Sequence, residues 1–90
     1  MKLLFCRECN DVIRIVPEDI RECQCGKVKG RYLEDGYHAE YSGDEAIPVA
    51  FLNSSFAEAI REQPQEGGGY RFDAFVVPVK CDTFVKKEKL

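Results

Sequence analysis

Short apolar runs separated by polar breaks fill the first half of the chain. They are rich in β-branched and aromatic residues, which are typical of strands, and they lie at residues 2–5, 12–16, 28–33, 37–41 and 46–52. Within the second run, Arg14 interrupts the apolar residues and faces the other way from its neighbours. Pro48 cannot donate a hydrogen bond to a neighbouring strand, so we expect its segment at a sheet edge or near a strand end. The pattern predicts a sheet of short strands.

One stretch, SSFAEAIREQP at residues 54–64, has the period of an amphipathic helix. Ser55 and Glu58 are spaced as in a capping box, and Pro64 ends the pattern. The expected apolar stripe consists of Phe56, Ala59, Ile60 and Gln63. We predict a single helix here, packed on the sheet.

The segment after the helix changes character twice. The letters QPQEGGG predict a flexible turn, and residues 70–85 read as one long or bent strand, or a pair, broken near Pro78. The residues that we expect in the core are Phe5, Val12, Ile15, Tyr32, Ile47, Val49, Phe51, Phe56, Ile60, Phe72, Phe75 and Val77.

Length and composition indicate one folded domain with a small core. The chain has 90 residues, of which 44% are hydrophobic and 32% charged, unlike a disordered chain. The apolar run at the start is too short for a signal peptide or a membrane span, so we expect a cytoplasmic protein with no membrane contact. Thiols stay reduced there, and the odd number of five cysteines also argues against a disulfide framework.

The charges are segregated along the chain. The formal net charge is −3, which disfavours non-specific binding to nucleic acid. Residues 21–33 are nevertheless basic, and residues 34–45 carry five acidic groups with no Lys or Arg. Both segments fit solvated surfaces; the basic one also fits a nucleic-acid contact through Arg21, Lys27, Lys29 and Arg31.

Two cysteine pairs carry the clearest chemistry. Two residues lie between Cys6 and Cys9, one lies between Cys23 and Cys25, and 13 residues separate the pairs. Two tight turns facing each other could surround a tetrahedral ion with four sulfurs at about 2.3 Å. Asn10 or Gly26 follows each pair, and both residue types enter the left-handed conformation that such turns require. The spacing therefore predicts one structural metal ion, with zinc as the first candidate.

Other uses of the cysteines remain open at this point. Four thiolates can also hold iron, the first pair has the spacing of a redox dithiol, and an exported protein could form two disulfides. Cys81 is typical of a small buried hydrophobe, but it could also serve as a nucleophile with His38 and either Asp35 or Glu40. No phosphate-binding loop or other catalytic pattern is present, so we expect no enzymatic activity.

The paired cysteines and Gly26 resemble the zinc-ribbon family over residues 1–33. The second pair is one residue shorter than the usual pattern of that family. The resemblance implies a β domain whose two knuckles clamp a structural zinc, and a role in docking to nucleic acid or protein. The longer stretch CQCGKVKGRYLEDG also resembles small bacterial and phage proteins.

We therefore expect an α+β fold over residues 1–90. It comprises a zinc-ribbon part at 1–33, a strand-helix-strand extension at 34–85 and a frayed tail at 86–90. The expected function is a zinc-binding adaptor or regulatory module that docks on another protein, through an exposed strand edge or exposed aromatic residues. The candidate contact residues are Tyr32, Tyr37, His38 and Tyr41. A nucleic-acid-binding ribbon is the alternative.

Overall fold

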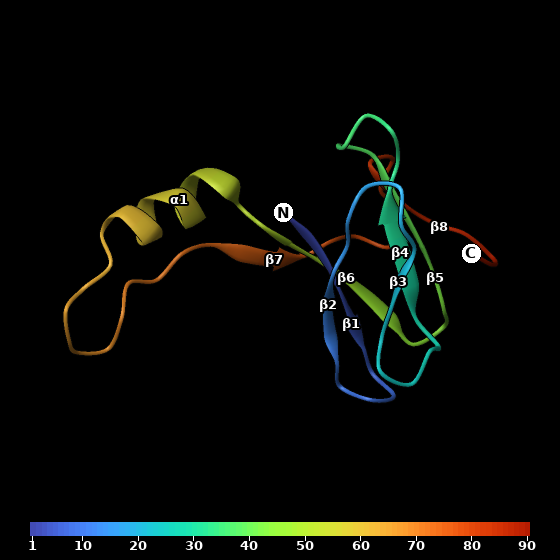
Figure 1. Cartoon of the computed structure of the whole chain (residues 1–90), viewed down its shortest axis with the longest axis horizontal. Coiled ribbons are helices and arrows are strands. Elements are labelled where there is room, and N and C mark those ends of the chain that lie inside the picture. The colour runs from blue at the N-terminus through green and yellow to red at the C-terminus, as the bar shows by residue number, and fades with distance from the viewer.

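The computed structural model describes residues 1–90 as two four-stranded sheets and one helix (Figure 1). Sheet A has the order β2-β1-β6-β7, and sheet B has the order β3-β4-β5-β8. Neighbouring strands are antiparallel except β5 and β8, which are parallel. The strands are β1 (Lys2–Cys6), β2 (Val12–Arg14), β3 (Arg21–Glu22), β4 (Lys29–Tyr32), β5 (Ala39–Ser42), β6 (Ala46–Phe51), β7 (Ala74–Val76) and β8 (Phe84–Lys86).

The strands expected in the first half of the chain are all present. The sequence gives no signal for β3, which is only two residues long. The apolar segment at 70–85 is divided between the sheets: β7 joins β6 in sheet A, and β8 joins β5 in sheet B. Pro78 lies in the connection between them, as expected from its missing N–H group.

The expected α+β fold with a helix packed on the sheet is wrong. The helix α1 (Asn53–Arg61) begins two residues after the end of β6 and extends away from both sheets (Figure 1). Ala59 is its only buried residue. Because Leu52 alone separates strand from helix, the chain continues outward instead of turning back over a sheet. The fold is sheet-rich, with one short helix on a projection.

The predicted capping box is also wrong. The helix begins before Ser55, and its N-cap residue, Leu52, provides no side-chain hydrogen bond. The Ser55 hydroxyl instead accepts a hydrogen bond of 2.8 Å from the backbone N–H of Asp73. Ser55 thus holds the returning chain against the helix.

The core lies between the two sheets. Its largest fully buried side chains include Leu4 and Ile15 from one side and Phe84 from the other. Phe84 meets the ring of Tyr41 edge to face, with the ring centroids 5.1 Å apart. A Cβ atom on Gly30 would lie 2.5 Å from Leu4 Cδ1, so this glycine allows the sheets to approach closely.

Most of the residues expected in the core lie outside it. Of those twelve, only Ile15 and Val77 are buried. Five of the others belong to the face of sheet A that points away from the core, namely Phe5, Val12, Ile47, Val49 and Phe51. Phe56, Ile60 and Phe72 lie on the projection. The inner face carries Leu4, Cys6, Ile13, Ala46, Pro48 and Ala50. The cross-strand register defines an outer face of sheet A, made of Leu3, Phe5, Val12, Arg14, Ile47, Val49, Phe51, Ala74 and Val76.

The one helix, α1, lacks the length and apolar character of a membrane-spanning segment.

Candidate metal centre

The two cysteine pairs lie in two similar turns. In the first knuckle, the N–H of Cys6 donates to the carbonyl of Asp11 at 2.9 Å; in the second, the N–H of Cys23 donates to the carbonyl of Val28 at 3.0 Å. Asn10 has φ 61° and Gly26 has φ 80°. The left-handed turns expected at these two residues are therefore confirmed.

The four sulfurs converge. Those of Cys6, Cys9, Cys23 and Cys25 all lie within 4.8 Å of one another. The sulfur of Cys25 is 3.7 Å from that of Cys6 and 3.5 Å from that of Cys23. A tetrahedron with metal–sulfur bonds of about 2.3 Å has edges of about 3.8 Å. All four are free thiols, and their spacing fits one tetrahedral metal ion.

The backbone and the neighbouring thiols divide the protons unequally within the cluster. Burial raises the pKa of Cys23, but the N–H of Val28, 3.4 Å from its sulfur, and the neighbouring thiols lower it to about 6. The N–H of Lys27 acts to lower the pKa of Cys25, yet burial and the three other thiols raise it to about 12. Four thiolates cannot share this space without a cation, and a divalent ion would replace the protons.

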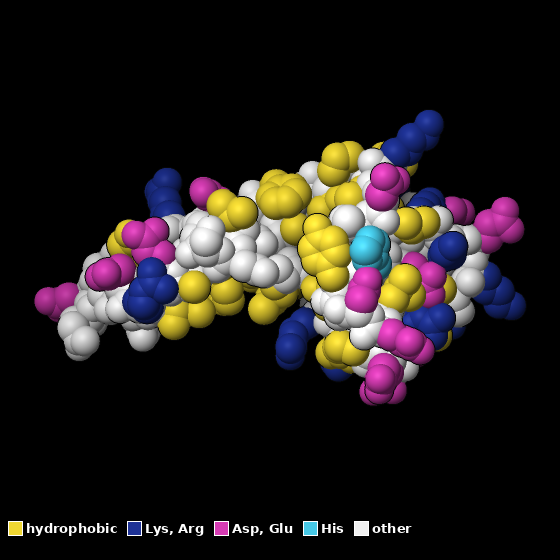
Figure 2. Space-filling view, turned by 90° about the horizontal axis from the view of Figure 1, so that it is seen from above, with side chains coloured by type: hydrophobic (Ala, Val, Ile, Leu, Met, Phe, Trp, Pro, Cys, Tyr) yellow, Lys and Arg dark blue, Asp and Glu magenta, His cyan; other side chains and the backbone are white.

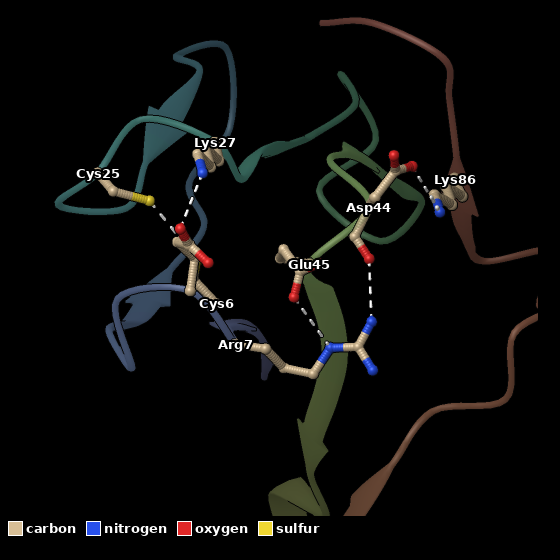
Figure 3. Close-up of polar contacts among 8 residues, drawn as sticks. Cys6, Arg7, Cys25, Lys27, Asp44, Glu45 and Lys86 are labelled. Atoms are coloured by element: carbon tan, nitrogen blue, oxygen red, sulfur yellow. Dashed lines mark hydrogen bonds and ion pairs between the residues drawn. The ribbon is translucent and has the colours of Figure 1, made fainter.

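Side-chain contacts join the two knuckles to each other. A carboxylate oxygen of Asp11 accepts a hydrogen bond of 2.9 Å from the N–H of Gln24, and Lys27 forms an ion pair of 2.9 Å with Glu8. Figure 3 shows the ammonium of Lys27 close to the Cys25 thiol, which itself points toward Cys6. The cation and the N–H groups offset the negative charge of the sulfurs.

Further contacts anchor the first knuckle to the loop that connects the two sheets. The backbone N–H of Arg7 donates to the carbonyl of Glu45 at 2.9 Å. Figure 3 shows the Arg7 guanidinium, which donates to the carbonyl of Asp44 at 3.1 Å and forms an ion pair of 3.6 Å with the Glu45 carboxylate. The cluster is closed by four protein sulfurs, of which those of Cys6 and Cys23 belong to buried residues. A closed set of four ligands is typical of a structural metal site.

The basic residues near the second knuckle are mostly paired. Lys27 contacts Glu8, Lys29 lies 4.0 Å from Glu22, and Arg31 lies 2.9 Å from Glu40; Arg21 has no ion pair. Three of the four cations expected to contact nucleic acid therefore already face carboxylates.

Of the residues expected at a partner surface, Tyr32 and Tyr37 lie together around Lys2 with His38 beside Tyr37, whereas Tyr41 is buried elsewhere. Tyr41 is only 2% exposed, so it belongs to the core and not to a contact surface. Tyr37 is 60% exposed, with the Lys2 ammonium 4.5 Å from its ring centroid. The hydroxyl of Tyr32 accepts a hydrogen bond of 2.9 Å from the N–H of Lys2. His38 lies beside Tyr37, with the two rings edge to face.

The residues of the possible nucleophile site occupy separate contacts. Nδ1 of His38 lies 2.5 Å from Asp35, whereas Glu40 faces Arg31. Cys81 lies 3.3 Å from the Thr83 hydroxyl, which lowers the pKa of the thiol, and has no hydrogen bond to His38. The structure therefore shows a His–Asp pair but no Cys–His pair.

One residue packed against the second knuckle could not be identified from the sequence. Gly43, in the turn between β5 and β6, has φ 117°, and a Cβ atom there would lie 2.3 Å from the carbonyl oxygen of Lys27.

Comparisons of the chain with protein-family models, curated proteins and solved structures find no match. Function is therefore inferred from the chain's own residues.

Proposed function

We propose that the protein binds one structural zinc ion through Cys6, Cys9, Cys23 and Cys25 and acts as a non-enzymatic protein-interaction module. The observation that carries the metal assignment is the approach of four sulfurs to within 4.8 Å of one another. Zinc is favoured over iron because it has no geometric preference of its own, and so tolerates the short Cys23–Cys25 pair.

The ion would fasten the two sheets together at one end. Cys6 is the last residue of β1 in sheet A, and Cys23 follows β3 in sheet B. A structural zinc contributes on the order of 10 kcal/mol of apparent binding free energy, which is comparable with the whole stability of a small domain. The core cluster contains only 12 buried residues, so this cross-link would supply a large part of the stability of the two-sheet domain.

Interaction is favoured over catalysis because four protein sulfurs leave the metal site no open position for a substrate, and because Cys81 has no hydrogen bond to His38. Protein is favoured over nucleic acid as the partner. The net charge is −3, and four thiolates on one divalent ion add about −2 more. Generic DNA or RNA should therefore bind weakly at physiological salt; submicromolar affinity for an oligonucleotide would reverse this order.

Elemental analysis of the purified, untreated protein tests the metal assignment. We expect one zinc per chain and no iron, and we expect a mercurial that titrates thiols to release the zinc in step with the four cluster cysteines. A ratio near zero, or the visible absorption of an iron–thiolate centre, would refute the zinc assignment. The Cys81 thiol is an internal control, since it should react without releasing metal.

A further inference from the structure

The outer face of sheet A is apolar, and its side chains range from nearly buried at Leu3, which is 9% exposed, to open at the margins. Of its nine positions, only Arg14 is charged. At its two margins, Val12 is 56% exposed and Val76 is 67% exposed. Soluble monomers seldom expose a contiguous apolar surface of this kind, and such surfaces mark interaction sites.

A second apolar surface lies on the projection formed by residues 52–73, here called the arm. The arm is narrow, and hydrophobic side chains gather along one side of it (Figure 2). Phe56 and Phe72 lie within 5.3 Å of Phe51 and of each other, measured between ring centroids. Since Phe51 belongs to the outer face of sheet A, this aromatic cluster places the apolar side of the arm on the same side of the molecule as that face.

The arm also contains an open cavity lined by both apolar and polar side chains, the polar ones being Gln63, Gln65 and Glu66. It has a volume of about 560 Å³ and lies between the helix and the returning chain. Phe56, Ile60, Tyr70 and Phe72 contribute to its lining, and Ile60 remains 61% exposed. An apolar side chain from outside could therefore enter the arm.

The arm contacts the outer face at Phe51 but cannot fold back over the rest of it. Leu52 is the only residue between β6 and α1, and its N–H donates to the carbonyl of Asp73 at 2.9 Å. Its carbonyl accepts from the N–H of Phe56 at 3.0 Å. Both backbone groups of Leu52 are thus engaged in keeping the arm in line with β6. Any cover for the outer face must come from another molecule.

We propose that this molecule is a second copy of the chain, and that the arm of each copy lies on the outer face of sheet A of the other. The two apolar surfaces point to the same side and lie end to end, so one two-fold rotation places each arm against the other copy's face. Such a contact is self-complementary and closed. This proposal rests on the proposed interaction function but not on the zinc.

The charges of the two surfaces are complementary. All six ion pairs of the chain lie outside the arm, and none of them involves Arg14. The arm carries more acidic than basic groups, namely Glu58, Glu62, Glu66 and Asp73 against Arg61 and Arg71. The one cation on the outer face therefore lacks a partner within its own chain, and an arm from a second copy supplies carboxylates.

The sizes of the surfaces also favour a reciprocal contact. The strands β2, β1, β6 and β7 have three, five, six and three residues and lie about 4.8 Å apart, which gives the outer face a flat area of roughly 270 Å². A stable interface buries about 800 Å² on each partner, so a contact limited to this face would be too small. A dimer with a second copy buries both the outer face and the arm of each chain, and therefore more surface than the face alone provides.

Sedimentation analysis of the full chain, with zinc measured on every sample, tests the proposal. We expect a dimer of the 10.3 kDa chain. Val76→Lys on the face and Ile60→Glu on the arm should each weaken dimerisation at least about 30-fold, because each buries an unpaired charge in an apolar contact. Val85→Lys on β8 of sheet B is the control, and it should remain dimeric.

Mixing the two variants separates this arrangement from other dimers. The mixed dimer has one native contact and one in which the new lysine meets the new glutamate, so an equimolar mixture should dimerise although neither variant does alone. A wild-type monomer at about 100 μM, a dimer insensitive to Ile60→Glu, or failure of the mixture would refute the proposal. If zinc stays at one per chain in those samples, the proposed metal function stands regardless.

Discussion

Replacing Gly43 by alanine should destabilise the protein more than replacing any other glycine of the chain by alanine. The new Cβ atom would lie 2.3 Å from the Lys27 carbonyl oxygen and 3.2 Å from Val28 Cα, both of them backbone atoms of the second knuckle. A side chain at φ 117° adds conformational strain. Strain and overpacking cost about 1–3 kcal/mol each, so we expect a loss of roughly 4 kcal/mol.

Thermal unfolding of the zinc-loaded protein measures this loss. In a domain of this size, 1 kcal/mol shifts Tm by about 4–8 °C, so the midpoint should fall by roughly 15–30 °C. Gly36→Ala is the matched control: its φ is 68°, but nothing lies within 4 Å of the added Cβ atom. We expect it to cost only about 1–2 kcal/mol, for its left-handed backbone alone.

Metal retention provides a second readout of the same change. The displaced Lys27 directly precedes Val28, whose N–H contacts the Cys23 sulfur at 3.4 Å. Gly43→Ala should therefore release zinc to a chelator faster than Gly36→Ala does. Equal melting temperatures for the two variants would refute the steric reasoning. Equal rates of zinc release despite unequal stabilities would refute the link from Gly43 to the knuckle.

The remaining predictions concern the cysteines, Asp35 and Tyr32. Cys25→Ser should lose zinc and unfold at a lower temperature, whereas Cys81→Ser should keep it; elemental analysis showing the reverse would overturn the ligand set. Hydrogen bonds from the backbone N–H of Tyr37 and from His38 lower the pKa of Asp35 to about 2. This carboxylate therefore stabilises the fold above about pH 4 and loses that effect as pH falls through 2, and NMR titration of its carboxyl carbon should show no midpoint near 4. Tyr32→Phe removes the acceptor for the Lys2 N–H and should cost about 1 kcal/mol in urea unfolding; an unchanged midpoint would contradict the role given to that bond.

The metal centre could be predicted from sequence because its determinants are local. Each knuckle needs two cysteines and a residue that tolerates positive φ within five positions, and Asn10 and Gly26 supply that residue. Its supporting contacts could not be predicted. The carboxylate of Asp11, the N–H of Val28 and the close approach of Gly43 depend on how segments distant in sequence meet.

The strands were predictable but their inward faces were not. In β1 and β2, Leu3 and Leu4, and likewise Val12 and Ile13, are apolar neighbours that point to opposite faces. Period-two alternation therefore fails to identify the buried side. Side-chain size was an equally poor guide to burial in sheet A, because its closely packed inner face takes small residues such as Ala46 and Ala50. In β6, the larger side chains of Ile47, Val49 and Phe51 lie on the outer face.

The helix illustrates a different limit of sequence reasoning. Its stripe of apolar residues correctly indicated a helix but not what it would contact. Phe56 meets Phe51 and Phe72, which lie at the base of the same projection, and no strand of sheet B. The direction of the helix depends on the single linking residue, Leu52, and on its bond to Asp73. An amphipathic sequence pattern indicates neither the direction of the helix nor the contacts that set it.

The two sheets are interleaved along the chain, and this has a consequence for the order of events during synthesis. Sheet A takes its strands from residues 2–14, 46–51 and 74–76, and sheet B takes its strands from 21–42 and 84–86. Neither sheet can close on the ribosome until its last strand emerges, because β7 completes sheet A and Phe84 of β8 completes the packing around Tyr41 in sheet B. All four cluster cysteines, in contrast, have emerged by residue 25. A nascent chain can therefore acquire its ion first and carry two open sheet edges, already tied at one end, until translation delivers β7 and β8.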